Sequence, residues 1–249
     1  MSNVVGVIPV RLESTRLARK VLQPIAGHSM LEWVYRRAGQ CRGLSRLLVA
    51  TDSEEVSAHC SALAIPVLKT SSKPRSGSER IIEVMRREPA DIYVNIQGDE
   101  PMVTEEHLDR MLAPFRERAG TQVSTLKVAI STEEAQDPNN VKVVTDAEDR
   151  ALYFSRSMIP YDRAGTGRVQ YFKHLGLYAY SAAALEAFSR LPVCQLEVEE
   201  SLEQLRFLHN GIPMVVLETR EDTIGVDTED DLQKVEAYFR ERGIRMPAS

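Results

Sequence analysis

The 249-residue sequence has few cysteines and no long apolar segment. Its three cysteines, Cys41, Cys60 and Cys194, are far apart and form no Cys-x-x-Cys pair, so neither a disulfide framework nor a zinc site is predicted. No apolar run approaches the roughly 20 residues that span a bilayer, and the sequence opens on an apolar run without a basic leader. We therefore expect a cytoplasmic protein with no membrane span.

The sequence also lacks an excess of positive charge. Its formal net charge is −5 at pH 7, whereas a protein whose main task is to neutralise a nucleic-acid backbone needs a basic face. We expect no nucleic-acid partner, and any polyanionic ligand must be bound by a local group of basic residues. The two commonest phosphate-binding loops are missing too, because there is neither a glycine-rich dinucleotide fingerprint nor a Gly-Lys-Ser/Thr sequence.

What the sequence does contain is a regular alternation of β-rich runs and segments of helical period over its first hundred residues. Met30, Val34 and Ala38 fall on one face of a predicted helix at 30–40. Further helices are predicted at 54–64 and 79–87, and strands at 4–10, 46–52, 65–70 and 91–99. This pattern predicts an α/β fold with a mostly parallel sheet, which binds ligands beyond the carboxyl ends of its strands.

The alternation weakens after about residue 137. Runs at 141–146, 151–156 and 174–180 predict an antiparallel excursion from the sheet, of the kind that caps a substrate site or pairs with another subunit. A helix at 198–209, a strand at 213–219 and a helix at 229–240 return to the α/β pattern. We predict a single domain over 1–249, with a substrate-capping or dimerisation insertion at about 145–200.

A basic loop follows the first predicted strand. Arg11, Arg16, Arg19 and Lys20 lie close together there, although the protein as a whole is acidic. Guanidinium forks, an ammonium and backbone N–H groups can bind a triphosphate through charge-assisted hydrogen bonds. The alternative interpretation is a solvated basic loop.

Two carboxylates, Asp99 and Asp227, follow apolar runs in distant parts of the sequence. The run IYVNIQGDEP places Asp99 at the carboxyl edge of the sheet, and Asp227 ends another short predicted strand. Mg²⁺ suits such a place, because it takes one or two carboxylates together with substrate phosphates and water. A tight turn before Pro101 is the alternative for the first segment. Helix capping by Thr228 and Asp231 is the alternative for the second, but it does not explain Asp227.

The segment RSGSER at 75–80 has the signature of a helix start. Ser76 and Glu79 have capping-box spacing, and Gly77 lets the backbone come close to a ligand. Helix starts offer unpaired N–H groups that can bind a nucleobase or an anion. A helix cap without any ligand is an equally good interpretation.

In this order the segments resemble the 3-deoxy-manno-octulosonate (Kdo) cytidylyltransferases, also called CMP-Kdo synthetases, a family with a Rossmann-like nucleotidyltransferase fold. The resemblance spans nearly the whole chain, and many separate matches in order are far more specific than any one of them. The matching residues and segments are Arg11, Ser14, Thr15, Arg16, Leu17 and Lys20, ATD at 50–52, SGSER at 76–80, QGDEP at 97–101, DPNNVKVV at 137–144, ALYFSR at 151–156, HLGLYAY at 174–180, LEQLR at 202–206 and GVDT at 225–228.

The resemblance implies an enzyme in which the anomeric hydroxyl of an acidic sugar attacks the α-phosphorus of CTP and pyrophosphate leaves. It implies that Asp99 and Asp227 hold Mg²⁺ against the phosphates, that Arg11 and Lys20 neutralise the triphosphate, and that the protein is a homodimer. We take these four residues as catalytic. The residues expected to bind CTP are Arg11, Ser14, Arg16, Lys20, Ser76, Gly77, Arg80 and Gln97. The residues expected to bind the small acidic acceptor are Arg156, His174, Tyr178, Glu203 and Gln204, to which we add Arg19.

Arg19 departs from the family pattern. The usual Pro-Gly before the loop lysine is replaced here by Ala18-Arg19, and the loop between Tyr161 and His174 is shorter than in typical relatives. These changes leave the CTP-binding residues intact and favour the hypothesis of a smaller or more highly charged acceptor, such as a phosphonate.

Two further interpretations stay open. A sugar-1-phosphate nucleotidyltransferase would share the fold but normally has a glycine-richer first loop. A catalytically silent nucleotide-binding module would be expected to lose a metal carboxylate or the loop lysine, and this sequence retains all three.

Overall fold

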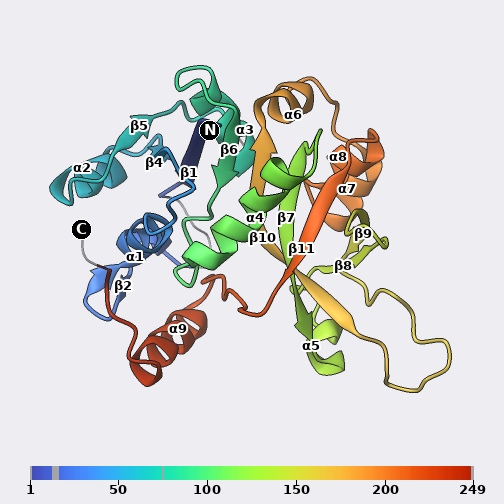
Figure 1. The fold of residues 1–249 in the computed structure, drawn as a ribbon. Helices are drawn as coiled ribbons and strands as arrows, with labels where there is room; N and C mark the ends of the chain where they lie inside the picture. The colour runs from blue at the N-terminus through green and yellow to red at the C-terminus, as the bar shows by residue number, and fades with distance from the viewer. Residues whose placement is uncertain (1, 13–16, 75, 248–249) are drawn as a thin grey trace. The chain divides into compact units, whose positions relative to one another are not determined.

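The computed structural model describes residues 2–12, 17–74 and 76–247. The chain divides into two compact units, one within residues 1–109 and 223–249 and the other within residues 110–222 (Figure 1). The predicted insertion at about 145–200 falls inside the second unit. Ser14 and Arg16 of the predicted CTP site lie outside the described residues.

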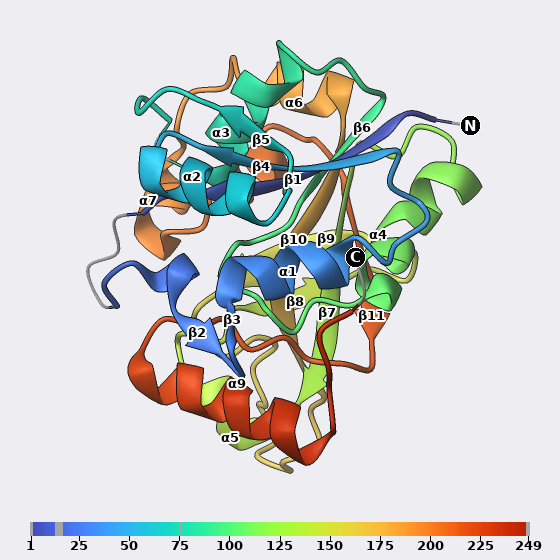
Figure 2. The same ribbon diagram turned by 90° about the vertical axis from the view of Figure 1, so that its left-hand side faces the viewer.

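The first unit contains a parallel sheet. Its strands are β1 (Val4–Val10), β4 (Arg46–Thr51), β5 (Val67–Lys69) and β6 (Ile92–Asn95), in the order β6-β1-β4-β5. Helices α1 (Met30–Ala38), α2 (Glu54–Ala62) and α3 (Gly77–Met85) join them and pack on them (Figure 2). Because helices cover the sheet, β1 and β6 are apolar and buried along almost their whole length.

A short hairpin enters the first unit between β1 and α1. The 3₁₀ helix η1 (Lys20–Leu22) is followed by β2 (Pro24–Ile25) and β3 (His28–Ser29), which pair antiparallel. The two residues between them, Ala26 and Gly27, both have positive φ, at 47° and 87°. Two positive φ angles in a two-residue connection match the right-handed twist of the flanking strands.

The C-terminal helix α9 (Glu229–Glu241) belongs to the first unit and packs against β2 (Figure 2). The predicted capping box at its start is confirmed, since Thr228 accepts from the Asp231 N–H and the Asp231 carboxylate accepts from the Thr228 N–H. The core beneath it centres on Trp33, whose ring lies 4.5 Å from that of Phe239. The other buried members of this cluster are Ile25, Met30, Met102, Val226, Leu232 and Val235.

The second unit contains the antiparallel strands that the sequence predicts. The strand β7 (Val123–Ile130) pairs parallel with β11 (Met214–Thr219) and antiparallel with β10 (Tyr171–Ser181). The strands β8 (Lys142–Thr145) and β9 (Ala151–Ser155) extend this arrangement, with β8 antiparallel to both β10 and β9. Its helices are α5 (Thr132–Gln136), α6 (Ala182–Phe188), α7 (Gln195–Glu200) and α8 (Leu205–His209), while α4 (Glu105–Glu117) begins in the first unit and ends in the second.

Two element predictions are wrong. The single helix predicted at 198–209 is two helices, because Ser201 ends α7 in the left-handed region at φ 52° and α8 begins only at Leu205. Asp227 does not end a strand, since the chain around it has no regular structure before α9. The helix α4 and the strand β7 were not anticipated at all.

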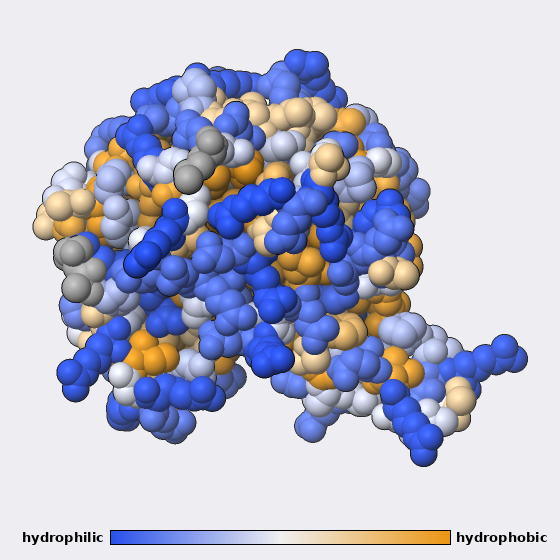
Figure 3. Space-filling view, in the orientation of Figure 1, coloured by the Kyte–Doolittle hydropathy of each residue, from blue (hydrophilic) through white to orange (hydrophobic). Residues whose placement is uncertain are grey.

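Hydrophilic residues cover most of the face seen in Figure 3, with apolar residues in smaller separate areas. The most exposed large apolar side chains of the described residues are Leu152, Tyr161, Val193 and Val198, and all four belong to the second unit. None of the helices in the described ranges is long and apolar enough to cross a bilayer.

The Trp33 indole anchors the core of the first unit through a hydrogen bond, from Nε1 to the Ile25 carbonyl oxygen at 2.7 Å. Trp33→Phe keeps an aromatic ring but removes this buried hydrogen bond and part of the side-chain volume. We expect the free energy of unfolding to fall by about 1–3 kcal/mol, measured by urea denaturation with circular dichroism. The control Tyr161→Phe, at a side chain that is 84% exposed, should change it by less than about 0.5 kcal/mol. Equal effects of the two substitutions would contradict this role for the bond.

Candidate active site

Three charged groups of the first unit meet beyond the carboxyl ends of its strands. The Lys20 Nζ lies 2.5 Å from Asp99 Oδ2 and 2.9 Å from Asp227 Oδ1. The lysine side chain is only 13% exposed, while those of Asp99 and Asp227 are 32% and 39% exposed. Each carboxylate is therefore held on one side by the ammonium and remains partly open to solvent. The structure thus brings together three of the four predicted catalytic residues.

Backbone contacts position both carboxylates. Asp99 lies in the turn that follows β6, where Gly98 packs closely on β1: a Cβ at that position would lie 3.0 Å from Val10 Cγ2. The Val226 N–H donates to the Asp99 carbonyl oxygen at 2.9 Å, which sets Asp227 beside Asp99. The Asp227 N–H in turn donates to Asp231 Oδ2 at 3.2 Å. The capping box of α9 thus also fixes the chain at Asp227.

The charge state of Lys20 follows from this geometry. Burial by itself lowers the pKa of Lys20, but the charges and hydrogen bonds of Asp99 and Asp227 outweigh it and raise that pKa above the ordinary value of 10.5. Lys20 is therefore an ammonium at neutral pH. One ammonium in contact with two carboxylates leaves a net negative charge, which favours the binding of a divalent cation beside them.

The same carboxylates fit a hard divalent cation. No group of three or more histidine, cysteine, aspartate or glutamate side chains suited to a metal occurs in the described part of the chain. A cation at Asp99 and Asp227 would need further oxygen ligands from water and phosphate. Mg²⁺ commonly binds in this way, through one or two carboxylates and the phosphates of its substrate.

The other described members of the basic loop lie apart from this contact. Arg11 follows β1 and is exposed. Burial lowers the pKa of the Arg80 guanidinium, and the positive charge of Arg11 contributes a smaller part of the same shift. Arg19 has a left-handed backbone, at φ 52°, a region that favours glycine. Its side chain forms an ion pair with Glu55 of α2.

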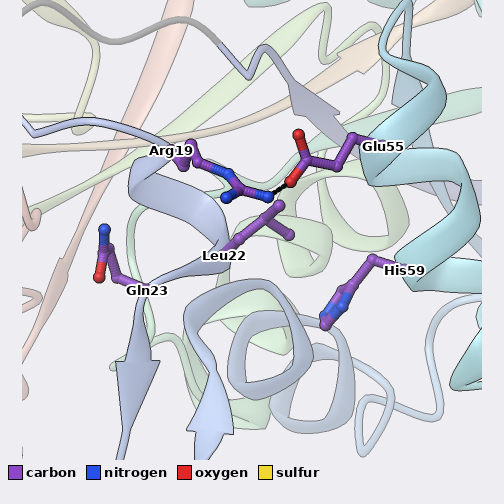
Figure 4. Close-up of a pocket in the computed structure, with 5 residues that line it drawn as sticks. All are labelled: Arg19, Leu22, Gln23, Glu55 and His59. Atoms are coloured by element: carbon purple, nitrogen blue, oxygen red, sulfur yellow. Dashed lines mark ion pairs between the residues drawn. The ribbon is translucent and has the colours of Figure 1, made fainter.

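Figure 4 shows the pocket around this ion pair. It has a volume of about 390 Å³ and is lined by Arg19, Leu22, Gln23, Glu55 and His59. The guanidinium of Arg19 points at Glu55 in this view. The role of Arg19 in acceptor binding stays a prediction, and in this structure its guanidinium is paired within the protein.

The predicted nucleotide-binding segment at 75–80 starts α3. Ser76 is its N-cap, and its Oγ accepts from the Glu79 N–H. Gly77 packs against the sheet, because a Cβ there would lie 3.3 Å from Pro9 Cγ and 3.4 Å from Asn95 Nδ2. A side chain here would crowd Pro9, so packing by itself favours glycine at this position. Gln97 follows β6 and is half-buried.

Among the described residues of the predicted CTP site, Arg80 is the most buried, with 1% of its surface exposed. Its Nη2 lies 3.1 Å from Asp52 Oδ1, and its Nη1 donates to Thr70 Oγ1 and, at 3.4 Å, to the Ser71 carbonyl oxygen. In this structure Arg80 therefore clamps α3 to the ends of β4 and β5.

Arg156 of the second unit is also held by the protein. Its Nε donates to the Glu200 carbonyl oxygen at 2.8 Å, and its Nη1 to the Pro138 carbonyl oxygen at 3.0 Å. The Glu200 carboxylate accepts from the Arg156 N–H at 2.8 Å and from Ser155 Oγ at 2.6 Å. The guanidinium thus lies against carbonyls at the end of α7, and an acceptor would have to share it with them.

His174 and Tyr178 on β10 lie side by side, with ring centroids 5.3 Å apart. Both are buried, and Phe154 of β9 contacts the other side of the imidazole at 4.9 Å. His174 Nε2 lies 3.0 Å from Thr125 Oγ1, and that hydroxyl donates to the Leu177 carbonyl oxygen at 2.6 Å. Since the hydroxyl proton is used there, Nε2 carries the imidazole proton and Nδ1 is left as an acceptor.

Glu203 and Gln204 lie in the short turn between α7 and α8. Gln204 is buried and Glu203 half-buried. The turn follows Ser201, whose carbonyl oxygen accepts from Arg156 Nη2 at 3.5 Å. The structure therefore places these two residues close in the chain to the segment that holds Arg156.

Sequence reasoning missed several residues of these sites. Glu200 holds Arg156 through hydrogen bonds, and Thr125 sets the tautomer of His174. Neither residue is conspicuous in the sequence, because Glu200 lies in an acidic run and Thr125 in an apolar one. Asn95 is a polar residue at the end of the apolar run IYVN just before QGDEP, and this position is the signal in the sequence that marks it.

The comparisons with known proteins show the family. A model of the cytidylyltransferase family matches residues 5–243. A 3-deoxy-manno-octulosonate cytidylyltransferase of Acidobacterium capsulatum is 54% identical over 240 residues, covering 96% of this chain and 98% of the relative. This chain belongs to the 3-deoxy-manno-octulosonate cytidylyltransferase family. It is therefore a nucleotidyltransferase, and the predicted α/β fold is confirmed.

Two further relatives extend this family match. A protein of the same description from Koribacter versatilis is 49% identical over 238 residues, covering 96% of this chain and 90% of the relative. The structure of a CMP:2-keto-3-deoxy-manno-octonic acid synthetase complexed with CTP matches with a TM-score of 0.93 at 42% identity, covering 97% of this chain and 100% of that one. Family and fold are thus the same along nearly the entire chain.

The buried imidazole gives the protein a specific sensitivity to acid. Burial, with a smaller effect of Lys173, lowers the pKa of His174 to about 3 from its usual 6.5. The unfolded chain therefore binds one proton more between these values. The contribution of neutral His174 to stability is complete above pH 6.5 and is lost as the pH falls toward 3.

We expect wild-type protein to lose about 3 kcal/mol more of its unfolding free energy between pH 7 and pH 4 than His174→Gln, because each pH unit is worth about 1.4 kcal/mol per proton. Denaturant titrations at the two pH values measure this difference. The control His209→Gln, at an exposed position, should behave like wild type. Parallel pH profiles for wild type and His174→Gln would show that the imidazole is not held neutral.

Proposed function

We propose that this protein transfers CMP from CTP to the anomeric hydroxyl of 3-deoxy-manno-octulosonate and releases pyrophosphate. The observation that carries the proposal is the contact of Lys20 with Asp99 and Asp227 at the edge of the sheet. It is supported by relatives along nearly the whole chain that are described as 3-deoxy-manno-octulosonate cytidylyltransferases. In the reaction the hydroxyl oxygen forms a bond to the α-phosphorus, and the bond from that phosphorus to the pyrophosphate oxygen breaks.

Lys20 and Arg11 act on the donor. Both lie on the segment that follows β1, and Lys20 is held as an ammonium by two carboxylates. Negative charge on the phosphate oxygens is the main electrostatic cost of binding CTP and of releasing pyrophosphate, so fixed cations there stabilise both the bound nucleotide and the leaving group.

Asp99 and Asp227 would hold the Mg²⁺ that such a transfer requires. When bound, the ion supplies charge neutralisation at the phosphates and lowers the pKa of a coordinated hydroxyl. The proposal rests on the chemistry of two partly exposed carboxylates fixed side by side by backbone hydrogen bonds.

His174, Tyr178 and Arg156 would bind the acceptor. A neutral imidazole with a free Nδ1 can accept a hydrogen bond from a sugar hydroxyl, and its low pKa makes it unsuited to donate a proton at neutral pH. Arg156 would supply positive charge for the acceptor carboxylate. Binding, orientation and charge are thus the contributions expected of these residues.

The phosphonate hypothesis remains a second possibility for the acceptor. It rests on Arg19 and the short loop before His174, and pairing of Arg19 with Glu55 takes that guanidinium away from any acceptor in this structure.

The homodimer also stays a prediction, which is supported by the four exposed apolar side chains of the second unit.

An assay of pyrophosphate release tests the function directly. Purified protein with CTP and Mg²⁺ should turn over Kdo, and should do so faster than 8-amino-Kdo, sialic acid or small phosphonates, because the whole-length family match points to Kdo. Replacing CTP with ATP, GTP or UTP should reduce the rate. Efficient turnover of a phosphonate with no turnover of Kdo would reverse the choice of acceptor.

Loss of either carboxylate should abolish this turnover. We expect Asp99→Asn and Asp227→Asn to lower kcat about 100-fold or more. Their thermal midpoints should stay near that of wild type, because ion pairs with exposed partners contribute less than about 1 kcal/mol. The matched control Asp230→Asn, on the exposed first turn of α9, should keep full activity. Normal kcat in both site variants would exclude the metal assignment.

A further inference from the structure

A bulge interrupts the pairing of β10 with β7 in the second unit. The pairing keeps one register up to Leu175 and resumes at Tyr178, which lies opposite Thr125. The two residues between them, Gly176 and Leu177, are extra on β10 and have no counterpart in the described register of β7. Bulges bend a strand and re-aim its side chains, and they are over-represented next to active sites.

The bulge brings His174 and Tyr178 together. Residues four apart in a regular strand are separated by about 13 Å. These two lie opposite Lys127 and Thr125, which are only two residues apart on β7, and residues two apart point to the same face of a sheet. The rings are accordingly adjacent, with centroids 5.3 Å apart. Two of the predicted acceptor residues are thus neighbours because of the bulge.

The Thr125 hydroxyl contacts the carbonyls on either side of Gly176. It is fully buried, and its Oγ1 lies 2.6 Å from the Leu177 carbonyl oxygen and 3.2 Å from that of Leu175. The same oxygen lies 3.0 Å from His174 Nε2. A threonine hydroxyl has one proton to donate and two lone pairs. Whichever carbonyl takes the proton, the oxygen is left as an acceptor for an Nε2–H.

These contacts join the shape of β10 to the state of the imidazole. Burial lowers the pKa of His174 to about 3, so at neutral pH the ring holds one proton on one of its two nitrogens. The Thr125 hydroxyl fixes that proton on Nε2 and leaves Nδ1 as an acceptor. An imidazole that is to accept a hydrogen bond from a sugar hydroxyl needs this tautomer.

The neighbouring Ser124 shows that burial of a hydroxyl on β7 does not by itself produce such a network. Ser124 is also 0% exposed, but its Oγ has no hydrogen-bond partner among the described residues. It lies opposite Ala179, where the regular register has resumed. The hydrogen bonds of Thr125 therefore follow from its place beside the bulge.

We propose that Thr125 is a positioning residue of the acceptor site, whose hydroxyl holds the bulge of β10 and the imidazole of His174 so that His174 and Tyr178 bind the acceptor together. This inference rests on the proposed function, since it names a residue that acts on the acceptor through His174.

The test begins with Thr125→Val, which removes the hydroxyl and keeps the size and branching of the side chain. With CTP, Mg²⁺ and Kdo, the KM for Kdo should rise about 10-fold or more. The KM for CTP should stay within about twofold of wild type, because the described residues assigned to CTP belong to the first unit. Thr125→Ser retains the hydroxyl and should restore the KM for Kdo to within about threefold. The matched control Ser124→Ala, which removes an equally buried hydroxyl one residue away, should keep both KM values.

A purely structural role for Thr125 gives a different pattern. It would reduce the thermal midpoint and the folded fraction, and hence the apparent kcat, while the protein that remains folded keeps both KM values. An unchanged KM for Kdo in Thr125→Val, or a Thr125→Ser variant as impaired as Thr125→Val, would overturn the inference.

Imidazole ¹⁵N NMR of the wild-type protein gives a readout that needs neither turnover nor a variant of Thr125. The His174 signals are identified by their absence in His174→Gln. At pH 7 the proton should be on Nε2, and a proton on Nδ1 would overturn the inference. This measurement decides the matter if Thr125→Val does not fold. Failure of wild type to use Kdo with CTP and Mg²⁺ would instead refute the proposed function, and the NMR result would be unaffected by it.

Discussion

Like charges repel, so a cation between two carboxylates stabilises their position side by side at the edge of a sheet. Lys20 provides that cation in the first unit, in contact with both Asp99 and Asp227. It is separated from Asp227 by 207 residues and from Asp99 by 79. The ends of the first unit are thus tied to its middle by one ammonium group. The same ammonium is the one that the proposed function assigns to the phosphates of CTP.

The position of Asp227 beside Lys20 depends on the packing of the first unit. Asp227 does not belong to a strand, so its position is set by one backbone hydrogen bond, from the Val226 N–H to the Asp99 carbonyl oxygen, and by the burial of Val226. Val226 is buried in the cluster around Trp33, together with the apolar face of α9. Packing of an apolar core therefore determines the position of a charged group, and the energy that holds the carboxylate comes mainly from residues that touch no ligand.

Buried polar side chains in this protein differ in whether other protein groups form hydrogen bonds or ion pairs with them. Arg80 is held by Asp52, Thr70 and Ser71, and Arg156 by carbonyls of residues 138 and 200. These guanidinium groups hold the fold together whether or not they contact a ligand. Asn95 is the opposite case, since it is buried and its amide oxygen has no partner in the described structure.

The sequence by itself determined the alternation of strands and helices, the capping of α3 and α9, and the family, because these depend on local periodicity and on short ordered motifs. It also pointed to Lys20, Asp99 and Asp227 as separate features. It could not predict that the helix expected at 198–209 is interrupted at Ser201, since that break is a single left-handed residue in a helical pattern. Only the tertiary structure decided that Lys20 bridges the two carboxylates, that Arg19 pairs with Glu55, and that the buried amide oxygen of Asn95 meets no donor among the described residues. Those outcomes depend on which side chains meet after residues far apart in the chain have packed, and no local pattern encodes such a meeting.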